Sequence, residues 1–289
     1  MIPSATRQRI KQAKEAYDRL KKGKESLLLL LDEAEVAESV YNSNAIENST
    51  LTLAETEKIL LEMEVSRDVS VREVFEAKNL ARVMEYMRTK SQEAEVSDYL
   101  ILLLHKMLLG SINDEIAGRF RGLNEYVRVG SFIASPPEHV ARKIEEALVV
   151  YTSDHETYFV KKIARFHLEF ETIHPFLDGN GRIGRALINY QLLRLGFPTV
   201  IVRDKEKKTY YKGFGQYRDD KKTTIMETII SRSLLESLHK RIAYLKGQMI
   251  VLLADYVKET KQSLPALLNQ AKRQTLPAFR EKGVWKIGL

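Results

Sequence analysis

Apolar residues recur at helical spacing along most of the chain, and this pattern predicts a mostly α protein. Glycine and proline are scarce and fall mainly at the junctions between the periodic segments. Thr52 and Glu55 have the spacing of a capping box, so we expect a helix to begin there. The pattern further predicts one or two helices within residues 5–40, and helices over residues 71–90, 97–109, 137–151, 158–172 and 182–195.

The main β signal lies between residues 125 and 134, where aromatic and β-branched residues flank Gly130 and Ser131. This pattern predicts a short β-hairpin. Toward the end of the chain, residues 263–280 are consistent with two short helices joined by a turn. A glycine turn and an aromatic strand are expected over residues 281–287, and the whole segment resembles a small winged-helix module of the excisionase type.

The loop that follows the helix at 158–172 is shaped by proline and glycine. Because proline disfavours the α conformation in the residue before it, we expect Pro175 to end this helix and His174 to be extended. Gly179 and Gly181 allow a tight turn with positive φ and a close approach of the backbone to a ligand. Since the turn leads into a helix, free N–H groups and the positive end of the helix dipole converge there, which favours anion binding.

The charged side chains of this loop fit a metal-bound polyphosphate. Arg182 and Arg185 are about one helical turn apart, so both can face two adjacent phosphates. Asp178 is the only carboxylate in the loop, and Mg²⁺ is commonly held by one or two carboxylates together with phosphates and water. The imidazole of His174 titrates near neutral pH and can serve as a general base toward an incoming hydroxyl.

Residues 174–185 read His-Pro-Phe-Leu-Asp-Gly-Asn-Gly-Arg-Ile-Gly-Arg, which resembles the signature of Fic-domain proteins at every specified position. The resemblance implies a Fic-type helical core whose β-hairpin is a flap that binds the target peptide by strand addition. It covers roughly residues 35–245. Further segments that resemble the family are residues 117–121 before the flap, 133–137 at its end and 166–173 before the signature, and the pair Tyr210 and Tyr211.

The resemblance also implies an activity. Most Fic-domain proteins transfer AMP from ATP to a Ser, Thr or Tyr hydroxyl of a protein and release pyrophosphate. A branch of the family with lysine in place of the second glycine transfers phosphate, so Gly181 favours AMP transfer here. Matched by position, His174 is implied as the general base and Asp178 as the Mg²⁺ ligand. The residues implied in ATP binding are Gly179, Asn180, Gly181, Arg182 and Arg185, with Tyr210 and Tyr211 in the adenine pocket.

Residues 43–48, Ser-Asn-Ala-Ile-Glu-Asn, resemble the family's inhibitory motif Ser/Thr-x-x-x-Glu-Gly/Asn. The resemblance is to the class with an N-terminal inhibitory helix, and it implies an inhibitory role for Ser43 and for Glu47, which would pair with Arg185. A carboxylate in that position repels phosphate from the guanidinium it occupies. Some members use the same glutamate to position a water that removes AMP. A bifunctional AMP transferase and de-AMPylase is therefore an open alternative.

Composition sets further limits. The 289-residue chain is 44% hydrophobic, which is enough for one large domain or two smaller ones. It has no cysteine, so disulfides and thiol catalysis are excluded and a reducing compartment is favoured. Its longest apolar run, residues 27–31, is too short to span a membrane, and its start does not look like a signal peptide. We therefore expect a cytoplasmic protein without membrane contact. The net charge of +7 favours binding of polyanions in general but does not indicate which one.

We expect three parts: an N-terminal helical region with the inhibitory motif at residues 1–95, a Fic catalytic core at 96–245, and a basic helix-turn-helix or winged-helix-like segment at 246–289. From residue 251 onward, seven Lys and Arg stand against three Asp and Glu. An alternative function is therefore a DNA-binding regulator whose nucleotide pocket senses a ligand. The partners implied are ATP, Mg²⁺, an unidentified target protein or the chain itself, and a second copy in a homo-oligomer.

A third alternative is a di-iron protein. Glu171 and His174 have the Glu-x-x-His spacing used in di-iron helix bundles, and so do Glu236 and His239. Such a site needs an unbroken helix around each pair. The proline directly after His174 argues against it.

Overall fold

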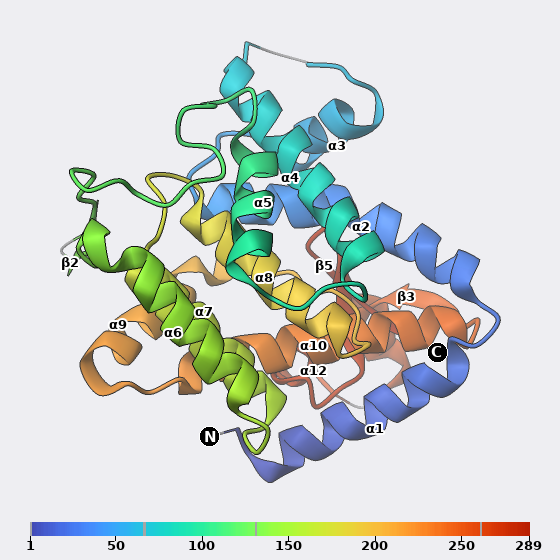
Figure 1. Ribbon diagram of the computed structural model, residues 1–289. Coiled ribbons are helices and arrows are strands. Elements are labelled where there is room, and N and C mark those ends of the chain that lie inside the picture. The colour runs from blue at the N-terminus through green and yellow to red at the C-terminus, as the bar shows by residue number, and fades with distance from the viewer. Residues whose placement is uncertain (1, 66–67, 131, 261) are drawn as a thin grey trace. The chain divides into compact units, whose positions relative to one another are not determined.

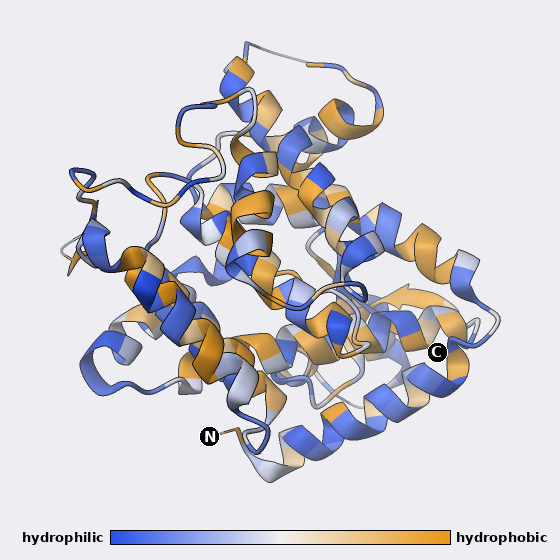
Figure 2. Ribbon diagram, viewed as in Figure 1, coloured by the Kyte–Doolittle hydropathy of each residue, from blue (hydrophilic) through white to orange (hydrophobic). Residues whose placement is uncertain are grey.

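Helices form most of the computed structural model, which describes residues 2–65, 68–130, 132–260 and 262–289 (Figure 1). Polar and apolar residues are mixed along these helices (Figure 2), and no described helix has the unbroken apolar length that spanning a bilayer requires. The α-helices of the described residues are α1 (Ser4–Leu20), α2 (Glu25–Ile46), α3 (Leu53–Leu61), α4 (Val71–Lys90), α5 (Asp98–Leu109), α6 (Val140–Ser153), α7 (Phe159–Ile173), α8 (Asn180–Arg194), α9 (Lys207–Asp220), α10 (Thr224–Leu245), α11 (Leu253–Tyr256) and α12 (Leu264–Arg273). Short 3-10 helices are η1 (Pro137–His139), η2 (Asp204–Glu206) and η3 (Val257–Glu259).

The chain divides into two compact units. The first contains Ala37–Gly196 and Ile201–Glu227. The second contains Ile2–Val36, Phe197–Val200 and Thr228–Leu289. The mostly α fold expected from the sequence is confirmed, while the division into functional parts at residues 95 and 245 stays a prediction.

Side chains that precede three helices of the first unit cap them, and the capping box at Thr52 and Glu55 is the one that the sequence predicts. The Thr52 hydroxyl accepts a hydrogen bond from the Glu55 N–H, and the Glu55 carboxylate accepts one from the Thr52 N–H, which completes the capping box at α3. Ser70 and Ser97 accept hydrogen bonds from backbone N–H groups three residues on, at the starts of α4 and α5. Each cap satisfies a donor that the first helical turn leaves without a partner.

Helices α7 and α8 hold the loop of residues 174–179 between them. Helix α7 packs against α6 and α9, and α8 packs against α4, α5 and α7. Because three helices surround α8, nearly every residue from Asn180 to Leu192 is buried. The amphipathic helix predicted here is thus a buried one, and the loop rests on rigid supports at both ends.

The predicted hairpin is present as β1 (Arg128–Val129) paired antiparallel with β2 (Phe132–Ile133). Gly130 lies in the turn with a φ of 60°, and Ser131 lies outside the described residues. The guanidinium of Arg218, in α9, stands over the Phe132 ring at 5.0 Å from its centroid. After β2 the chain enters η1 and then α6.

The end of the second unit has the order of a winged helix. Strands β3 (Ile250–Leu252), β4 (Ala278–Glu281) and β5 (Val284–Gly288) form an antiparallel sheet in the order β3-β5-β4. Helices α11 and α12 come between β3 and β4, and Leu267 and Ala271 of α12 are buried in the core of this segment.

The prediction of two helices within residues 263–280 is wrong in part. Helix α12 is one of the two predicted helices, but residues 278–281 form strand β4, and the other helix, α11, lies earlier in the chain. Pro277 cannot continue a helix, and the turn at Lys282 and Gly283 folds β4 back onto β5.

Buried ion pairs lie in the rest of the second unit. The Arg241 side chain is 1% exposed, and its Nη2 lies 2.5 Å from Asp32 Oδ1 and 2.7 Å from Glu35 Oε2. Lys240 Nζ lies 3.0 Å from the other oxygen of Glu35. The residues of the proposed iron-binding spacing are engaged elsewhere: Glu236 binds Arg280, and His239 bonds Gln274.

Candidate active site at the His174–Arg185 loop

His174 ends helix α7 in the left-handed conformation, with φ 53° and ψ 64°. The extended conformation predicted from Pro175 is therefore wrong for His174. Its N–H still donates to the Phe170 carbonyl at 2.9 Å, which completes the last helical turn, and its own carbonyl turns toward Arg121. Proline excludes the α region for the preceding residue, but these two hydrogen bonds decide between the alternatives that remain.

Arg121 anchors the backbone on which His174 stands. Its buried guanidinium donates to the carbonyl oxygens of Glu125 (2.8 Å), Ser135 (2.7 Å), Ile173 (3.3 Å) and His174 (2.8 Å). The Arg121 N–H also donates to the Pro175 carbonyl at 3.0 Å. One side chain therefore joins the end of α7, the start of the loop and both ends of the segment that contains the hairpin.

The imidazole of His174 is neutral near pH 7. Its side chain is 16% exposed, and burial, followed by the charge of Arg121, lowers its pKa to about 4. Above that pH the ring carries a lone pair that can accept a proton. Its Nδ1 lies 3.9 Å from Glu171 Oε2, too far for a hydrogen bond.

Glu171 is a buried carboxyl with a raised pKa. Burial and then the charge of Glu47 raise this pKa to about 8, so the group is largely protonated at pH 7. Its Oε1, the Nδ1 of His174 and the Nδ1 of His167 are buried without a hydrogen-bond partner. Three polar atoms of the site thus have unused hydrogen-bonding capacity, which is uncommon in a folded interior.

Asn180 and Gly179 shape the loop itself. The Asn180 amide donates to the Phe176 carbonyl at 2.8 Å and accepts from the Phe176 N–H at 2.9 Å, so it binds both backbone groups of one loop residue. Gly179 has a φ of 82°, as the sequence predicts. His105 supports the loop from α5: its Nε2 lies 3.0 Å from the Asp178 carbonyl, and its ring stacks on Phe176 with centroids 3.6 Å apart.

The predicted turn with positive φ at Gly181 is wrong, because Gly181 lies within α8. The structure gives a different reason for a glycine there. A Cβ at this position would lie 2.1 Å from Glu47 Oε1 and 3.0 Å from Arg185 Nη1. Since real Cβ atoms do not approach other atoms so closely, any other residue would require the Glu47 carboxylate to move, whereas glycine admits it next to the first turn of α8 without a shift.

Arg185 is fully occupied by the segment at the end of α2. Its Nη2 lies 2.8 Å from Glu47 Oε1 and donates to the Ser43 carbonyl at 2.8 Å, while its Nε donates to the Ser43 hydroxyl at 3.0 Å. The side chain of Arg185 is only 6% exposed. Ser43 and Glu47 therefore cover the guanidinium on two edges, and a second anion cannot approach it without displacing Glu47.

Arg182 belongs to a ring of alternating charges that includes helix α4. Its Nη1 lies 3.1 Å from Glu76 Oε1 and its Nη2 lies 3.0 Å from Asp178 Oδ1. Arg72 of α4 closes the ring by binding both Glu76 and Asp178. Each of the four side chains thus contacts two partners of opposite sign, and the two signature arginines are both neutralised.

Asp178 fits a metal ion held by one carboxylate and phosphates. Its side chain is 32% exposed, which makes it accessible from solvent. The described residues contain no group of three or more His, Asp or Glu side chains that could hold a metal, so an ion here would take its other ligands from a bound phosphate and water. In this arrangement Arg72 and Arg182 bind the carboxylate, and Arg72 would have to move for a cation to bind.

The two tyrosines of the predicted adenine pocket differ in their surroundings. Tyr210 is buried, its hydroxyl lies 2.8 Å from His167 Nε2, and Arg185 Nη1 donates to it at 3.5 Å. Tyr211 is 42% exposed, and its hydroxyl donates to the Ile46 carbonyl at 3.4 Å. Tyr210 therefore supports Arg185, whereas the Tyr211 ring is accessible to a ligand.

Several residues of the site escaped the sequence analysis. Arg121 lies in the segment at residues 117–121 that resembles the family, so a signal existed for it. Glu171 lies in the run before the signature, but its spacing suggested only an iron ligand. Arg72, Glu76 and His105 lie on other helices, and nothing in the order of their residues indicates that α4 and α5 meet the loop.

Known proteins support the family that this geometry suggests. The model of the Fic/DOC family matches residues 95–192. "Protein adenylyltransferase fic-1" of Caenorhabditis elegans is 33% identical over 178 residues, which are 60% of this chain and 34% of that protein. The chain thus spans about a third of the length of the curated relatives it matches.

Solved structures extend the likeness to most of the chain. A Fic domain containing signaling protein from Bacteroides thetaiotaomicron has a TM-score of 0.74 at 25% identity, and the match covers 83% of this chain and 98% of that one. A Fic family protein from Desulfovibrio desulfuricans shares the fold over 98% of this chain and 86% of that one, with a TM-score of 0.67 and 19% identity. The predicted Fic fold is confirmed, and residues 95–192 match the model of the Fic/DOC family.

Proposed function

We propose that this protein transfers AMP from ATP to a hydroxyl of a protein and that Glu47 holds the enzyme inhibited. The observation that carries the proposal is the contact of Glu47 with Arg185 over the first turn of α8, beside the neutral imidazole of His174. The names of the adenylyltransferase relatives support the reaction class.

In the proposed reaction, His174 accepts the proton of the target hydroxyl as its oxygen attacks the α-phosphorus of ATP. The bond from that phosphorus to its bridging oxygen breaks, and pyrophosphate leaves with the electron pair. A lone pair on the ring is available at pH 7 because the pKa of His174 is lowered to about 4. The N–H groups at the start of α8 and the two signature arginines would bind the phosphates.

A magnesium ion on Asp178 would neutralise phosphate charge during the reaction. Asp178 is held in place by the loop: its Oδ1 accepts from the Gly179 N–H at 2.6 Å, and its carbonyl meets His105. Tyr211, which is partly exposed, is the proposed contact for adenine.

Inhibition follows from competition for Arg185. The carboxylate of Glu47 lies where an anion at the α8 N-terminus would bind, and it forms a short ion pair with a guanidinium that is almost completely buried. A γ-phosphate of ATP would meet a carboxylate there instead of a free guanidinium. Removing the carboxylate would leave Arg185 free for phosphate, still supported by Ser43 and Tyr210.

The test is the transfer of label from ATP labelled in its α-phosphate, with Mg²⁺ and a cell lysate. We expect Glu47→Gly to label itself or other proteins at least about tenfold more than the parent, and His174→Ala in the Glu47→Gly background to abolish the label. Glu62→Gly, which removes an exposed carboxylate at the end of α3, is the matched control and should behave as the parent. The proposal fails if neither the parent nor Glu47→Gly binds ATP.

A second function, DNA binding, is favoured by one observation. Residues 250–288 have the strand, helix and hairpin order of a winged helix, and α12 ends with exposed Lys272 and Arg273. Three other basic side chains of the segment are paired: Arg280 with Glu236, Lys286 with Glu281 and Lys258 with Asp255. Binding of the full chain to a DNA duplex that weakens with salt and with Lys272→Ala plus Arg273→Ala would support this function; duplex binding that these changes leave unaltered would contradict it.

A further inference from the structure

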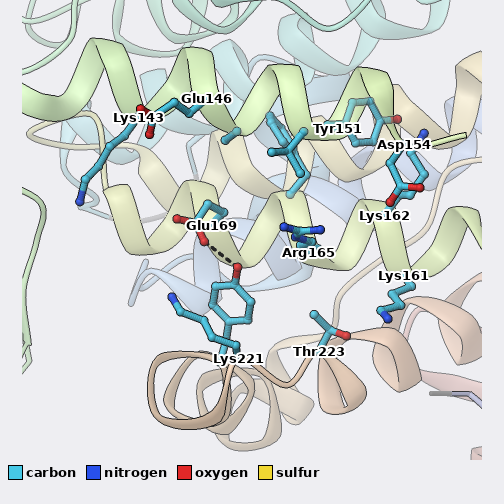
Figure 3. A pocket seen from close by; sticks show the side chains of 14 residues that line it. Lys143, Glu146, Tyr151, Asp154, Lys161, Lys162, Arg165, Glu169, Lys221 and Thr223 are labelled. Atoms are coloured by element: carbon cyan, nitrogen blue, oxygen red, sulfur yellow. Dashed lines mark hydrogen bonds between the residues drawn. The ribbon is translucent and has the colours of Figure 1, made fainter. Parts of the chain in front are cut away.

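A cavity of about 550 Å³ lies in the first unit, apart from the His174–Arg185 loop (Figure 3). One face of α6 and one face of α7 form two of its walls, and Tyr217, Lys221 and Thr223 close it from the end of α9 and the turn after it. The size is within the range of pockets that take a small molecule or one or two large side chains.

The acidic residues that line this cavity have partners, whereas its basic residues form no ion pair in the described part of the chain. Each of its three acids has a partner: Glu146 pairs with Arg142, Asp154 accepts from the Thr157 N–H, and Glu169 accepts from the Tyr217 hydroxyl at 2.6 Å. The five basic residues of the lining form no ion pair within the described residues; they are Lys143, Lys161, Lys162, Arg165 and Lys221. The cavity therefore presents net positive charge to whatever enters it.

The same cavity has an apolar and aromatic lining. Ala147, Val150 and Tyr151 come from α6, Phe166 comes from α7 and Tyr217 from α9. Two of the lysines stand over these rings: Lys162 Nζ lies 4.9 Å from the Tyr151 centroid and Lys221 Nζ lies 4.7 Å from that of Tyr217. Cations over rings leave their outer N–H groups free for an anion, while the rings offer contact to an apolar group.

Two contacts connect the cavity with the hairpin. Lys143, which lines the cavity, donates to the hydroxyl of Ser135, two residues after β2, at 2.9 Å. Arg218, next to the lining residue Tyr217 in the sequence, stands over Phe132 of β2. The hairpin segment is therefore in contact with one residue that lines the cavity and with the neighbour of another.

We propose that this cavity binds a segment of the protein substrate that carries an aromatic or large apolar side chain beside acidic ones. The inference rests on the proposed function and on the family resemblance, which implies that the hairpin holds the target by strand addition. Strand addition reads mainly backbone and gives little selectivity, so side-chain pockets next to the strand have to supply it. The five unpaired cations would bind the acids, and the rings would cover the apolar side chain.

Direct binding tests the proposal without any need for catalysis. The probe is a short fluorescein-labelled peptide with one Phe among Asp and Glu residues, and its matched partner has Lys in place of every acid. We expect the full chain to bind the acidic peptide in preference to the basic one, and Lys161→Glu with Arg165→Glu to weaken acidic-peptide binding about tenfold or more. Lys11→Glu with Lys258→Glu makes the same change in net charge at side chains that are 78% and 79% exposed, and should bind as the parent does.

Two results of that experiment overturn the proposal. One is equal binding of the acidic peptide by the two double variants; the other is displacement of the peptide by AMP, which would identify the cavity as a nucleotide site. Thermal unfolding of each variant shows whether a loss of binding comes with a loss of fold.

Labelling of other proteins tests the same cavity in the reaction. In the Glu47→Gly background, Lys161→Glu with Arg165→Glu should lower the label on lysate proteins about tenfold and leave self-labelling unchanged. An unchanged pattern of labelled lysate proteins contradicts the cavity's role. If Glu47→Gly itself transfers no label, the proposed function fails, and the peptide experiment still decides what the cavity binds.

Discussion

The arginines of the His174–Arg185 segment are paired with carboxylates, whereas, among the described residues, the cations that line the cavity beside the hairpin are not. In the loop, Arg182 lies between Glu76 and Asp178, and Arg185 faces Glu47. In the cavity, Arg165 and four lysines line the walls without an ion pair in the described part of the chain. The first arrangement is internally neutral, and the second leaves its charge to solvent.

Burial explains the difference. The side chains of Arg182 and Arg185 are 4% and 6% exposed, and a buried guanidinium without a counter-charge is costly. Arg165 is exposed, so water stabilises its charge. A ligand of the loop therefore has to displace protein carboxylates, whereas a ligand of the cavity displaces only water. These arrangements fit the inhibition proposed for the loop and the recognition proposed for the cavity.

The largest expected difference in stability is between a variant that loses the buried cation Arg182 and one that loses the exposed cation Arg165. Arg182→Met leaves Glu76 and Asp178 facing each other without the guanidinium between them, and should lower the free energy of unfolding by about 3 kcal/mol. Arg165→Met removes an unpaired, exposed charge and should change it by less than about 0.5 kcal/mol. Urea unfolding of the two variants measures both values, and similar losses would remove the distinction between the regions.

Asn180→Ala should cost about 2 kcal/mol, because it leaves both the N–H and the carbonyl of Phe176 without their side-chain partner. The loop would lose its closure, so AMP transfer in the Glu47→Gly background should also fall. Asn269→Ala, at an exposed position of α12, is the control and should leave both quantities unchanged. Full stability in Asn180→Ala would show that the loop does not depend on this amide.

Glu171→Gln tests the buried carboxyl through its pH dependence. In the folded chain the pKa of Glu171 is about 8, above its ordinary value of 4.5, so between these pH values the folded state keeps a proton that the unfolded state releases. The parent should therefore lose stability relative to Glu171→Gln as pH rises through this window, by several degrees in Tm at pH 8. Tm curves from pH 5 to 9 that run parallel would contradict the raised pKa.

Arg72→Ala should have only a small effect on stability, less than about 1 kcal/mol, because the Arg72 side chain is 57% exposed. The substitution frees one oxygen of Asp178. In the Glu47→Gly background, the Mg²⁺ concentration that gives half-maximal labelling should therefore fall about threefold or more. Lys90→Ala removes another exposed cation, which is paired with Glu93, and serves as the control. An unchanged Mg²⁺ requirement would show that Arg72 does not compete with the metal.

Much of the fold could be predicted because its signals are local. Thr52 and Glu55, three residues apart, form the predicted capping box, and the hairpin forms around Gly130. Where tertiary contacts decide, prediction failed. His174 adopts the left-handed conformation because Arg121, far away in sequence, holds its carbonyl.

The sequence indicated part of the residues that meet at the candidate site, but not how most of their charges are paired. The signature gave His174, Asp178 and both arginines, and the motif at residues 43–48 gave Glu47 as the partner of Arg185. Nothing in the sequence indicated that Arg182 would be neutralised by α4, because that contact depends on how helices pack. The cavity was missed for the same reason: its walls come from faces of α6 and α7 that each look like ordinary solvated surfaces.

The packing of Gly181 against Glu47 couples these two positions in evolution. A side chain at position 181 would meet the Glu47 carboxylate where it now lies, so that carboxylate, the end of a flexible side chain, would have to move. An exchange of this glycine for a larger residue is thus expected to alter the contact of Glu47 with Arg185 as well. If Glu47 controls the site as proposed, selection on one position acts on the other.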